Sequence, residues 1–274
     1  MEKTYLEKIQ ETAEFIIAQV SEMPKIGVIL GTGLGDLVNH IEISYELEYK
    51  DIPNFPVSTV EGHSGKLIFG NLGGKYIMAM QGRFHYYEGY DMKEVTFPVR
   101  VMKQLGVNTL FVSNAAGGMN KEFIVGDVMV ITDHINLFPE NPLRGKNYEE
   151  LGPRFPAMTE PYSLALIGMA DDIAKENGIR LMHGVYVGTS GPTFETPAEY
   201  EYFRIIGGDA VGMSTVPEVI VANHAGMKCF GVSVITDLGG KDIQEVPTHE
   251  EVQKAAIKAQ PVMTQIIKEM LERL

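Results

Sequence analysis

Short apolar runs alternate with segments of helical periodicity along almost the whole chain, and this alternation constrains the fold most. Strands are predicted over the apolar runs at residues 26–30, 67–69, 76–80, 109–113, 127–132, 180–187 and 229–236. Helical spacing marks residues 4–22, 93–105, 164–175, 197–206, 216–225 and a last helix that starts at the capping box of Thr248 and Glu251. The pattern predicts an α/β fold with a central mixed, largely parallel β-sheet flanked by helices.

No linker, repeat or low-complexity segment divides the sequence. Its 274 residues suffice for one large α/β unit with a core of its own, so residues 1–274 are predicted to form a single domain. The longest stretch without a regular pattern spans about residues 136–159 and holds several prolines and glycines. A loop of that length in a compact domain is more often functional than idle.

Acidic residues outnumber basic ones, 36 to 23, and give a net charge of −13. Such a field repels nucleic acid, so we expect no nucleic-acid partner, and a bound phosphate would need a few converging cations and N–H groups. Because no apolar stretch approaches the roughly 20 residues of a membrane span and no secretory pattern is present, we expect no membrane partner and a cytoplasmic location. The single cysteine, Cys229, lies in an apolar run and is predicted to be a buried free thiol.

A glycine-rich turn, Gly-Thr-Gly-Leu-Gly at residues 31–35, follows the first predicted strand and precedes a helical stretch. Such a turn can direct N–H groups and the Thr32 hydroxyl at an anion, although a plain strand-to-helix turn explains the glycines equally well. A dinucleotide fingerprint requires glycine where Asp36 stands, so a nicotinamide or flavin cofactor is not expected.

The segment after the strand at 76–80 is rich in polar and aromatic side chains and reads Gln-Gly-Arg-Phe-His-Tyr-Tyr-Glu-Gly-Tyr at residues 81–90. Ligands of α/β proteins gather where strands end, and Arg83 and His85 point the same way in an extended chain. Together they offer a guanidinium fork and a second polar contact for a phosphate. An arginine stacked on a ring is the plainer explanation, but the density of polar and aromatic groups favours a site.

Two other strand ends carry small residues, which let a ligand approach the backbone closely. Residues 113–118 read Ser-Asn-Ala-Ala-Gly-Gly, and residues 211–218 read Val-Gly-Met-Ser-Thr-Val-Pro-Glu. Ser214 is well placed to cap the helix that follows, and capping explains this serine about as well as ligand binding does.

Carboxylates and histidines at other turns have both structural and functional explanations. Phe194 and Glu195, in the turn at residues 191–196, suit a planar heterocycle with N–H edges, although an isolated glutamate is usually exposed. Asp237 ends a predicted strand, where it could exchange a proton with a leaving group or cap a turn. For His63 and His249 the two readings cannot be separated. No His, Cys or carboxylate residues have metal-ligand spacing, so no metal is predicted.

Taken jointly, these segments resemble the trimeric purine nucleoside phosphorylases, whose relatives include the methylthioadenosine phosphorylases. The matching stretches follow the family's order and are residues 31–35, 54–56, 62–65, 82–90, 114–118, 154–158, 191–196 and 212–218. The resemblance implies a phosphorylase/hydrolase-like α/β fold, a homotrimer, and a pentosyltransferase activity in purine salvage. It implies no cofactor, because inorganic phosphate is a co-substrate.

The resemblance also implies roles for individual residues. The phosphate-binding residues would be Thr32, His63, Arg83, His85, Ala115 through its backbone N–H, and Ser214. The nucleoside-binding residues would be Tyr87, Phe155, Phe194, Glu195, Met213, Asp237 and His249. Of these, Phe155 would reach into the sugar site of a neighbouring subunit. His85, Glu195 and Asp237 would carry the catalysis.

Asp237 stands where the family usually has asparagine. An ionised aspartate accepts from N7–H and tolerates a 6-amino group but repels a 6-oxo oxygen, whereas a protonated one could serve a 6-oxo base. Methylthioadenosine phosphorylases have aspartate there, while His249 and Met213 resemble the nucleoside branch. Inosine and guanosine, or their deoxy forms, are therefore the leading substrates. The alternatives are adenosine or methylthioadenosine phosphorolysis and, further off, a nucleoside hydrolase or a non-catalytic sensor.

Overall fold

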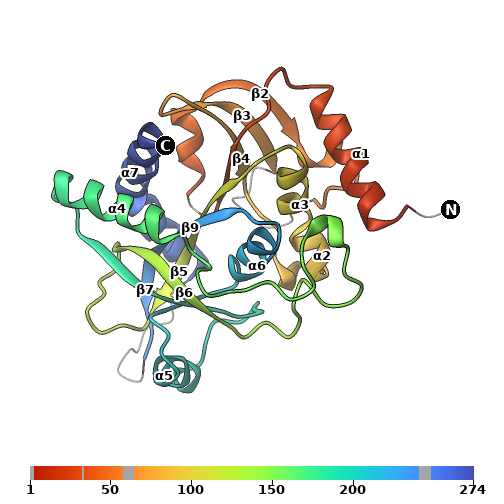
Figure 1. Ribbon diagram of the computed structural model, residues 1–274. Helices are drawn as coiled ribbons and strands as arrows, with labels where there is room; N and C mark the ends of the chain where they lie inside the picture. Colours follow the sequence, from red (N-terminus) through yellow and green to blue (C-terminus); the bar gives the residue numbers. More distant parts are fainter. Residues whose placement is uncertain (1–2, 33, 58–64, 241–247) are drawn as a thin grey trace.

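The computed structural model describes residues 3–32, 34–57, 65–240 and 248–274 (Figure 1). Its strands are β1 (Ile26–Leu30), β2 (Glu42–Glu48), β3 (Lys66–Leu72), β4 (Lys75–Gln81), β5 (Thr109–Gly118), β6 (Val128–Asn136), β7 (Leu181–Gly188), β8 (Ala210–Gly212) and β9 (Lys228–Leu238). Over the described ranges they form one nine-stranded sheet in the order β2-β3-β4-β1-β5-β8-β7-β6-β9, with a further pairing between β5 and β9.

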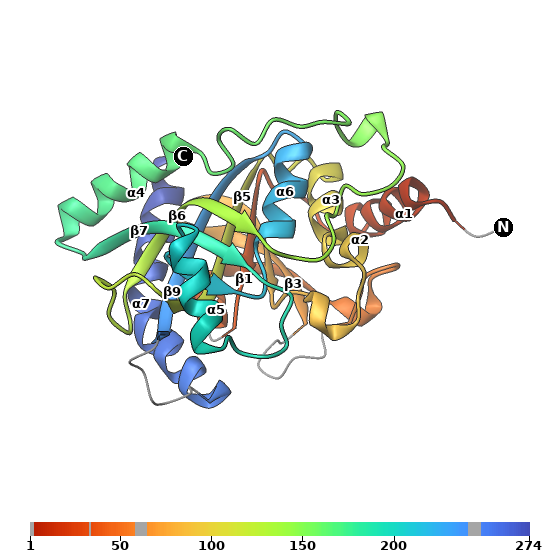
Figure 2. The ribbon, with the colours of Figure 1, turned by 90° about the horizontal axis from the view of Figure 1, so that it is seen from below.

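Helices cover the sheet on both faces. They are α1 (Tyr5–Ile17), α2 (Met92–Val95), α3 (Phe97–Gln104), α4 (Leu164–Asn177), α5 (Pro197–Ile205), α6 (Val216–His224) and α7 (His249–Arg273), with short 3₁₀ turns η1 (Gly35–His40), η2 (Tyr49–Asp51), η3 (Tyr86–Glu88) and η4 (Glu149–Leu151). Helix α4 packs on α7, and α3 packs on α1 and α6 (Figures 1 and 2). The sheet lies between these helices and positions the ends of its strands.

The predicted mixed sheet is confirmed. Strand β1 runs parallel to β4 and β5, β5 runs parallel to β9, and β7 runs parallel to β6 and β8. The remaining pairings, β2–β3, β3–β4, β5–β8 and β6–β9, are antiparallel. Two strands were not predicted: β2 is mostly exposed and so lacks a buried apolar run, and β8 has only three residues.

Local capping signals set the starts of the terminal helices. Thr4 and Glu7 form a capping box at α1, which ends at Ile17 and is shorter than the predicted 4–22. The predicted box of Thr248 and Glu251 is confirmed at α7, and this helix continues through Pro261.

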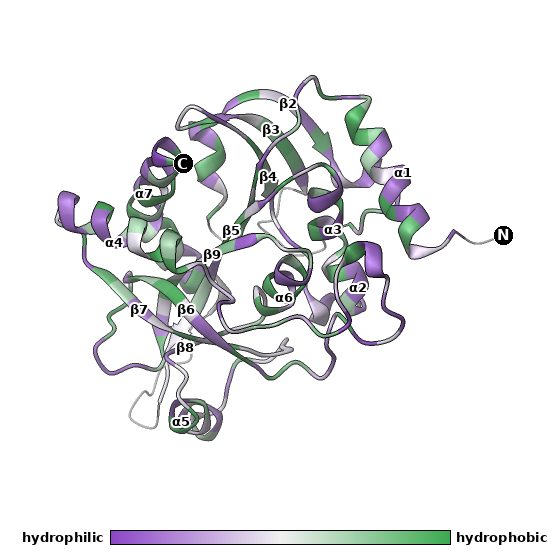
Figure 3. Cartoon of the chain, viewed as in Figure 1, coloured by the Kyte–Doolittle hydropathy of each residue, from purple (hydrophilic) through white to green (hydrophobic). Residues whose placement is uncertain are grey.

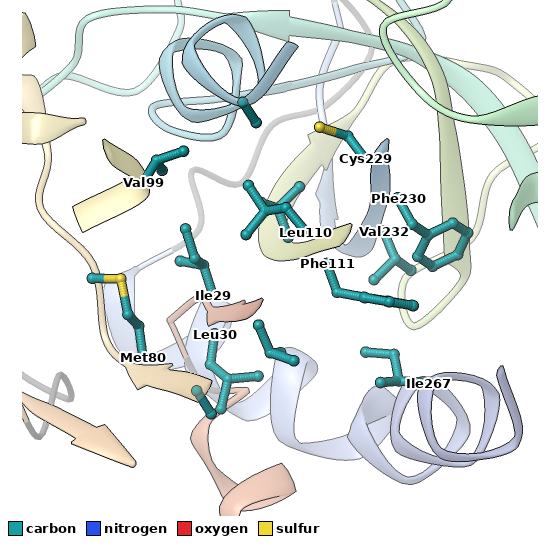
Figure 4. Close-up of a cluster of buried hydrophobic side chains, with 14 of the residues drawn as sticks. Ile29, Leu30, Met80, Val99, Leu110, Phe111, Cys229, Phe230, Val232 and Ile267 are labelled. Carbon is teal, nitrogen blue, oxygen red and sulfur yellow. The ribbon is translucent and has the colours of Figure 1, made fainter. Parts of the chain in front are cut away.

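The core lies between the sheet and the helices, and apolar residues concentrate on the central strands (Figure 3). Ile29 of β1 and Phe111 of β5 meet Ile267 of α7 in one cluster of buried side chains (Figure 4). Cys229 is buried there, as predicted, and burial raises the pKa of its thiol to about 12. A helix with the length and apolar character to cross a lipid bilayer is not found among the described residues.

The parallel strands β4, β1 and β5 run side by side, with Leu30 opposite Gln81 and Ile29 opposite Val112. Strands β4 and β1 end at this level, whereas β5 continues to Gly118 in pairing with β9 and β8. Residues 113–118 therefore lie inside β5, which is longer than the predicted 109–113, beside the segments that follow β1 and β4. The register therefore brings those motifs together.

The two-residue turn between β3 and β4 provides a test of how this hairpin packs against α7. Gly73 and Gly74 both have positive φ, 57° and 72°, as a type I′ turn requires. A Cβ at Gly73 would lie 2.7 Å from the Lys268 carbonyl oxygen of α7, whereas a Cβ at Gly74 would meet nothing within 4 Å.

We expect Gly73→Ala to destabilise the protein by about 1–3 kcal/mol more than Gly74→Ala, because both carry the cost of positive φ and only the first clashes with α7. Urea unfolding followed by circular dichroism measures the difference. Equal losses in the two variants would show that the hairpin does not press on α7.

Candidate active site

One pocket lies at the strand ends, and most of the predicted site residues line it. Its wall contains Thr32, Arg83, His85, Tyr87, Ala115, Phe194, Glu195, Met213, Ser214 and Asp237. A larger groove between η1 and α7 contains none of them. Convergence of polar groups, rather than size, therefore identifies the candidate site.

Arg83 follows β4 and is the most constrained cation of the pocket, with 1% of its surface exposed. Its Nε donates to Glu218 Oε1 at 3.2 Å, and its Nη2 lies 3.2 Å from Glu218 Oε2. Its Nη1 donates to the Ser113 carbonyl at 2.7 Å and to Ser214 Oγ at 3.0 Å. The buried carboxylate of Glu218, on α6, thus both neutralises the guanidinium and fixes its plane.

His85 lies two residues further along and is also buried. Its backbone N–H donates to Glu88 Oε1 at 2.8 Å, and its Nδ1 lies 3.0 Å from the same oxygen. The ring stacks on Tyr87, with centroids 4.7 Å apart. Burial lowers the pKa of His85, while Glu88 opposes this shift, so the imidazole is neutral at pH 7 and Nδ1–H donates to the carboxylate.

Ser214 does not cap α6, and that expectation was wrong. Thr215 occupies the N-cap position, and it has a φ of 70°, which is rare for a β-branched residue. Its hydroxyl accepts from Asn114 Nδ2 at 2.9 Å and lies 3.1 Å from Ser214 Oγ. The unusual backbone leaves the Ser214 hydroxyl beside Arg83 instead of at the helix end, which is an arrangement typical of functional sites.

The glycine-rich turn after β1 packs directly on the middle of β5. A Cβ at Gly31 would lie 2.7 Å from the Ser113 carbonyl oxygen and 2.8 Å from Asn114 Cα. This close approach places Thr32 in the pocket wall with Ala115 and Ser214. The four predicted anion-binding segments that the structure describes therefore meet at one end of the pocket.

Two carboxyls occupy the other end. A register shift after Ala116 brings Asp237 of β9 opposite Gly117 of β5. Asp237 Oδ1 accepts from Thr236 Oγ1 at 2.9 Å. Burial raises the pKa of Asp237, and burial together with the charge of Asp237 raises the pKa of Glu195. Glu195 is half-buried, whereas an isolated glutamate is usually exposed.

Tyr200 is a pocket residue that the sequence did not reveal. It lies on α5 and its hydroxyl donates to Asp237 Oδ2 at 3.3 Å. In the sequence it is one more aromatic residue of an amphipathic helix, with no local pattern to distinguish it. Glu88 and Glu218 were visible inside the quoted motifs, but nothing in the sequence assigned them a partner.

The remaining predicted residues fall outside this arrangement. Phe155 is 88% exposed, in the loop between η4 and α4, and does not line the pocket of its own chain. Arg154 lies over its ring and donates to the carbonyls of Leu143 and Gly145, which ties the loop together. His63 lies outside the described residues, and of His249 only the backbone, at the start of α7, is described.

The pocket has opposite polarity at its two ends. Cationic and hydroxyl donors around Arg83 can hold a compact anion, and the carboxyls of Glu195 and Asp237 can accept from N–H groups of a flat ring. Tyr87 and Met213 line the space in which a bridging group would lie. Among the described residues, no group of three or more His, Cys, Asp or Glu side chains could hold a metal ion.

Comparison with known proteins agrees with this geometry. Residues 25–272 match the phosphorylase superfamily. The chain is 52% identical to purine nucleoside phosphorylase 1 of Bacillus subtilis, over 96% of this chain and 97% of the relative, and 49% identical to the purine nucleoside phosphorylase of Bos taurus, over 95% and 93%. The crystal structure of Schistosoma mansoni purine nucleoside phosphorylase with inosine superposes with a TM-score of 0.94 at 41% identity, over 99% of this chain and 98% of that one. Purine nucleoside phosphorylases are pentosyltransferases. The chain therefore belongs to the purine nucleoside phosphorylase family, within the phosphorylase superfamily.

Proposed function

We propose that this protein cleaves purine nucleosides with inorganic phosphate and releases a free purine and ribose 1-phosphate or deoxyribose 1-phosphate. Inosine and guanosine are the leading substrates. The observation that carries the proposal is the presence in one pocket of the donor cluster around Arg83 and the carboxyls of Glu195 and Asp237. Structures of the Schistosoma enzyme in complex with inosine and with hypoxanthine support it.

Phosphate binds at the cationic end in this proposal. Arg83 is held by Glu218 and Ser113, so its guanidinium is already oriented when the anion arrives. The hydroxyls of Thr32 and Ser214, the N–H of Ala115 and the ring of His85 complete the site. Because the guanidinium is oriented before binding, little reorganisation free energy is lost during the reaction.

The reaction is a displacement at C1′ of the sugar. A phosphate oxygen forms a bond to C1′ while the C1′–N9 bond breaks, and the electron pair of that bond passes to the purine. The bound phosphate stabilises the positive charge on the sugar. N7 of the departing base takes a proton from solvent while the attacking hydrogen phosphate releases its own, so the products are the neutral purine and the sugar 1-phosphate dianion. Asp237 then accepts a hydrogen bond from N7–H, and Glu195 accepts from the N–H edge of the ring.

Asp237 favours a second candidate, the phosphorolysis of 6-aminopurine nucleosides such as adenosine or methylthioadenosine. Its Oδ1 and Oδ2 both accept hydrogen bonds from hydroxyl donors, which stabilise the ionised form and so lower its pKa against the effect of burial. An ionised carboxylate suits a 6-amino donor. The Schistosoma enzyme has also been crystallised with adenosine.

The same proposal includes a homotrimer, a cytoplasmic location and no cofactor. Phe155 supports the oligomer, because an aromatic side chain that is 88% exposed on a tied loop is a good contact for a second subunit. In the trimer it would close the sugar site of the neighbouring chain.

The direct test incubates the protein with inosine, guanosine or adenosine, with and without phosphate, and follows base release by chromatography. Phosphorolysis requires phosphate in every case. Release in phosphate-free buffer would indicate a hydrolase, and tight binding of inosine without turnover would indicate a sensor.

Ser214→Ala should raise the phosphate KM by about 10- to 100-fold, because a hydrogen bond to a charged ligand contributes about 1.5–3 kcal/mol. Steady-state rates at varied phosphate concentration measure this KM. Ser21→Ala, at an exposed serine far from the pocket, is the control. An unchanged KM in Ser214→Ala would remove this hydroxyl from the phosphate site.

Asp237→Asn should raise the kcat/KM for inosine relative to adenosine by about tenfold or more, because an amide donates to a 6-oxo oxygen and clashes electrostatically with a 6-amino group. Both nucleosides are measured in parallel with Asp133→Asn, an exposed aspartate of β6, as control. The same ratio in all three proteins would exclude Asp237 as the selector.

Phe155→Ala should raise the nucleoside KM about tenfold while the trimer persists by light scattering, since a buried aromatic contact contributes more than about 1 kcal/mol. Trimers that mix Phe155→Ala chains with Arg83→Lys chains should be more active than trimers of either variant alone. In such a trimer an intact Arg83 can face an intact Phe155 from its neighbour. No gain on mixing would mean that each chain builds its site alone.

A further inference from the structure

The Tyr200 hydroxyl lies between the two carboxyls of the pocket. It donates to Asp237 Oδ2 at 3.3 Å. Burial raises the pKa of Tyr200, and the neighbouring carboxyls of Asp237 and Glu195 raise it further, so both act on the same hydroxyl. All three side chains line the same wall. Three oxygen-bearing groups from α5, β9 and the turn before α5 therefore lie together at the carboxyl end of the site.

The backbone fixes where that hydroxyl lies. A Cβ at Gly117 would be 2.7 Å from the Tyr200 hydroxyl, and a Cβ at Gly239 would overlap its ring. The N–H of Gly239 donates to the Gly118 carbonyl at 2.9 Å, which joins the two segments that flank the ring. Tyr200 is 8% exposed. The ring fills a slot that only glycines leave open, so the hydroxyl cannot swing away from the carboxyls.

The Tyr200 hydroxyl has a single O–H donor. It can donate to one carboxylate and, at the same time, accept from the other carboxyl if that one is protonated. Two carboxyls in a partly desolvated pocket favour retaining a single proton between them. The described ionisable neighbours do not oppose this, because Glu199 of α5 adds negative charge near Glu195, the charge of Arg83 is neutralised by Glu218, and the imidazole of His85 is neutral.

We propose that Glu195 and Asp237 share one proton through the Tyr200 hydroxyl, and that the side on which this proton resides decides whether the site accepts a 6-oxopurine or a 6-aminopurine. This rests on the proposed function, since it requires that a purine lie against both carboxyls. Tyr200 is then a positioning residue that acts through Asp237 and Glu195 rather than on the reacting atoms.

The transfer conserves atoms and charge. The O–H bond of protonated Glu195 breaks as that proton bonds to the Tyr200 oxygen, and the original Tyr200 O–H bond breaks as its proton bonds to Asp237 Oδ2. Glu195 ends as the carboxylate, Asp237 ends as the neutral acid, and Tyr200 remains a neutral phenol. No proton enters from solvent, and no ionised tyrosine forms.

Each arrangement matches one class of base. A 6-oxopurine has a donor at N1 and an acceptor at O6, so it fits ionised Glu195 and protonated Asp237. A 6-aminopurine has an acceptor at N1 and a donor at N6, so it fits protonated Glu195 and ionised Asp237. The two complexes contain the same number of protons. One site can therefore take both classes at the same pH.

The test measures hypoxanthine and adenine binding by calorimetry at saturating phosphate, in buffers of different ionisation enthalpy and from pH 5 to 9. In the wild-type protein both bases should bind with the same net proton uptake at every pH. If Asp237 instead titrates alone, hypoxanthine binding takes up protons where adenine binding releases them, and this result overturns the shared proton.

Tyr200→Phe keeps the ring in its slot and removes the hydroxyl. Since the lost donor stabilised ionised Asp237, the proton should move to Asp237, and the adenine affinity should fall about tenfold relative to hypoxanthine. The net proton uptake on binding should then differ between adenine and hypoxanthine. Tyr202→Phe, at an exposed tyrosine of the same helix, should leave both unchanged.

The outcomes separate this inference from the proposed function. If both bases bind but Tyr200→Phe behaves like Tyr202→Phe, the shared proton is wrong and a purine site remains. If the binding follows the expectation and no nucleoside is cleaved, the shared proton is supported and phosphorolysis fails. If neither base binds, both proposals fall.

Discussion

The buried pair of Arg83 and Glu218 is the interaction on which the rest of the pocket depends. Removing two charges from water is expensive, and only mutual neutralisation together with the Ser113 carbonyl makes the guanidinium tolerable in the interior. The pair joins the end of β4 to α6 and, through the Ser113 carbonyl, to the middle of β5. Loss of either partner would leave a buried charge without compensation, so the site and the fold share this contact.

The topology explains how a chain with a net negative charge gathers a cation and N–H donors in one wall of the pocket. Strands β4 and β1 end side by side next to the middle of β5, which places Arg83, Thr32 and Ala115 in one wall although they are far apart in sequence. The net charge of −13 is a property of the whole chain and does not describe this wall of the pocket. Binding of an anion depends on a few donors at short range, where local geometry outweighs the distant field.

Much of the fold and most of the site could be predicted from the sequence, because buried strands and the motifs at their ends are local signals. Strand β2 escaped because an exposed edge has no apolar run, and the role of Thr215 escaped because a left-handed threonine has no pattern. Glu218 and Tyr200 owe their importance to partners on other elements, Arg83 and Asp237. Such contacts exist only after folding, so sequence spacing could not supply them.

The backbone of Thr215 has a consequence for attempts to make this protein more robust. A β-branched residue at a φ of 70° costs of the order of 1–3 kcal/mol, and glycine would remove that strain. Glycine would also delete the hydroxyl that joins Asn114 to Ser214. Thermostability and the proposed affinity for phosphate would therefore compete at this one position, and selection for heat resistance alone would remove the hydroxyl that supports Ser214.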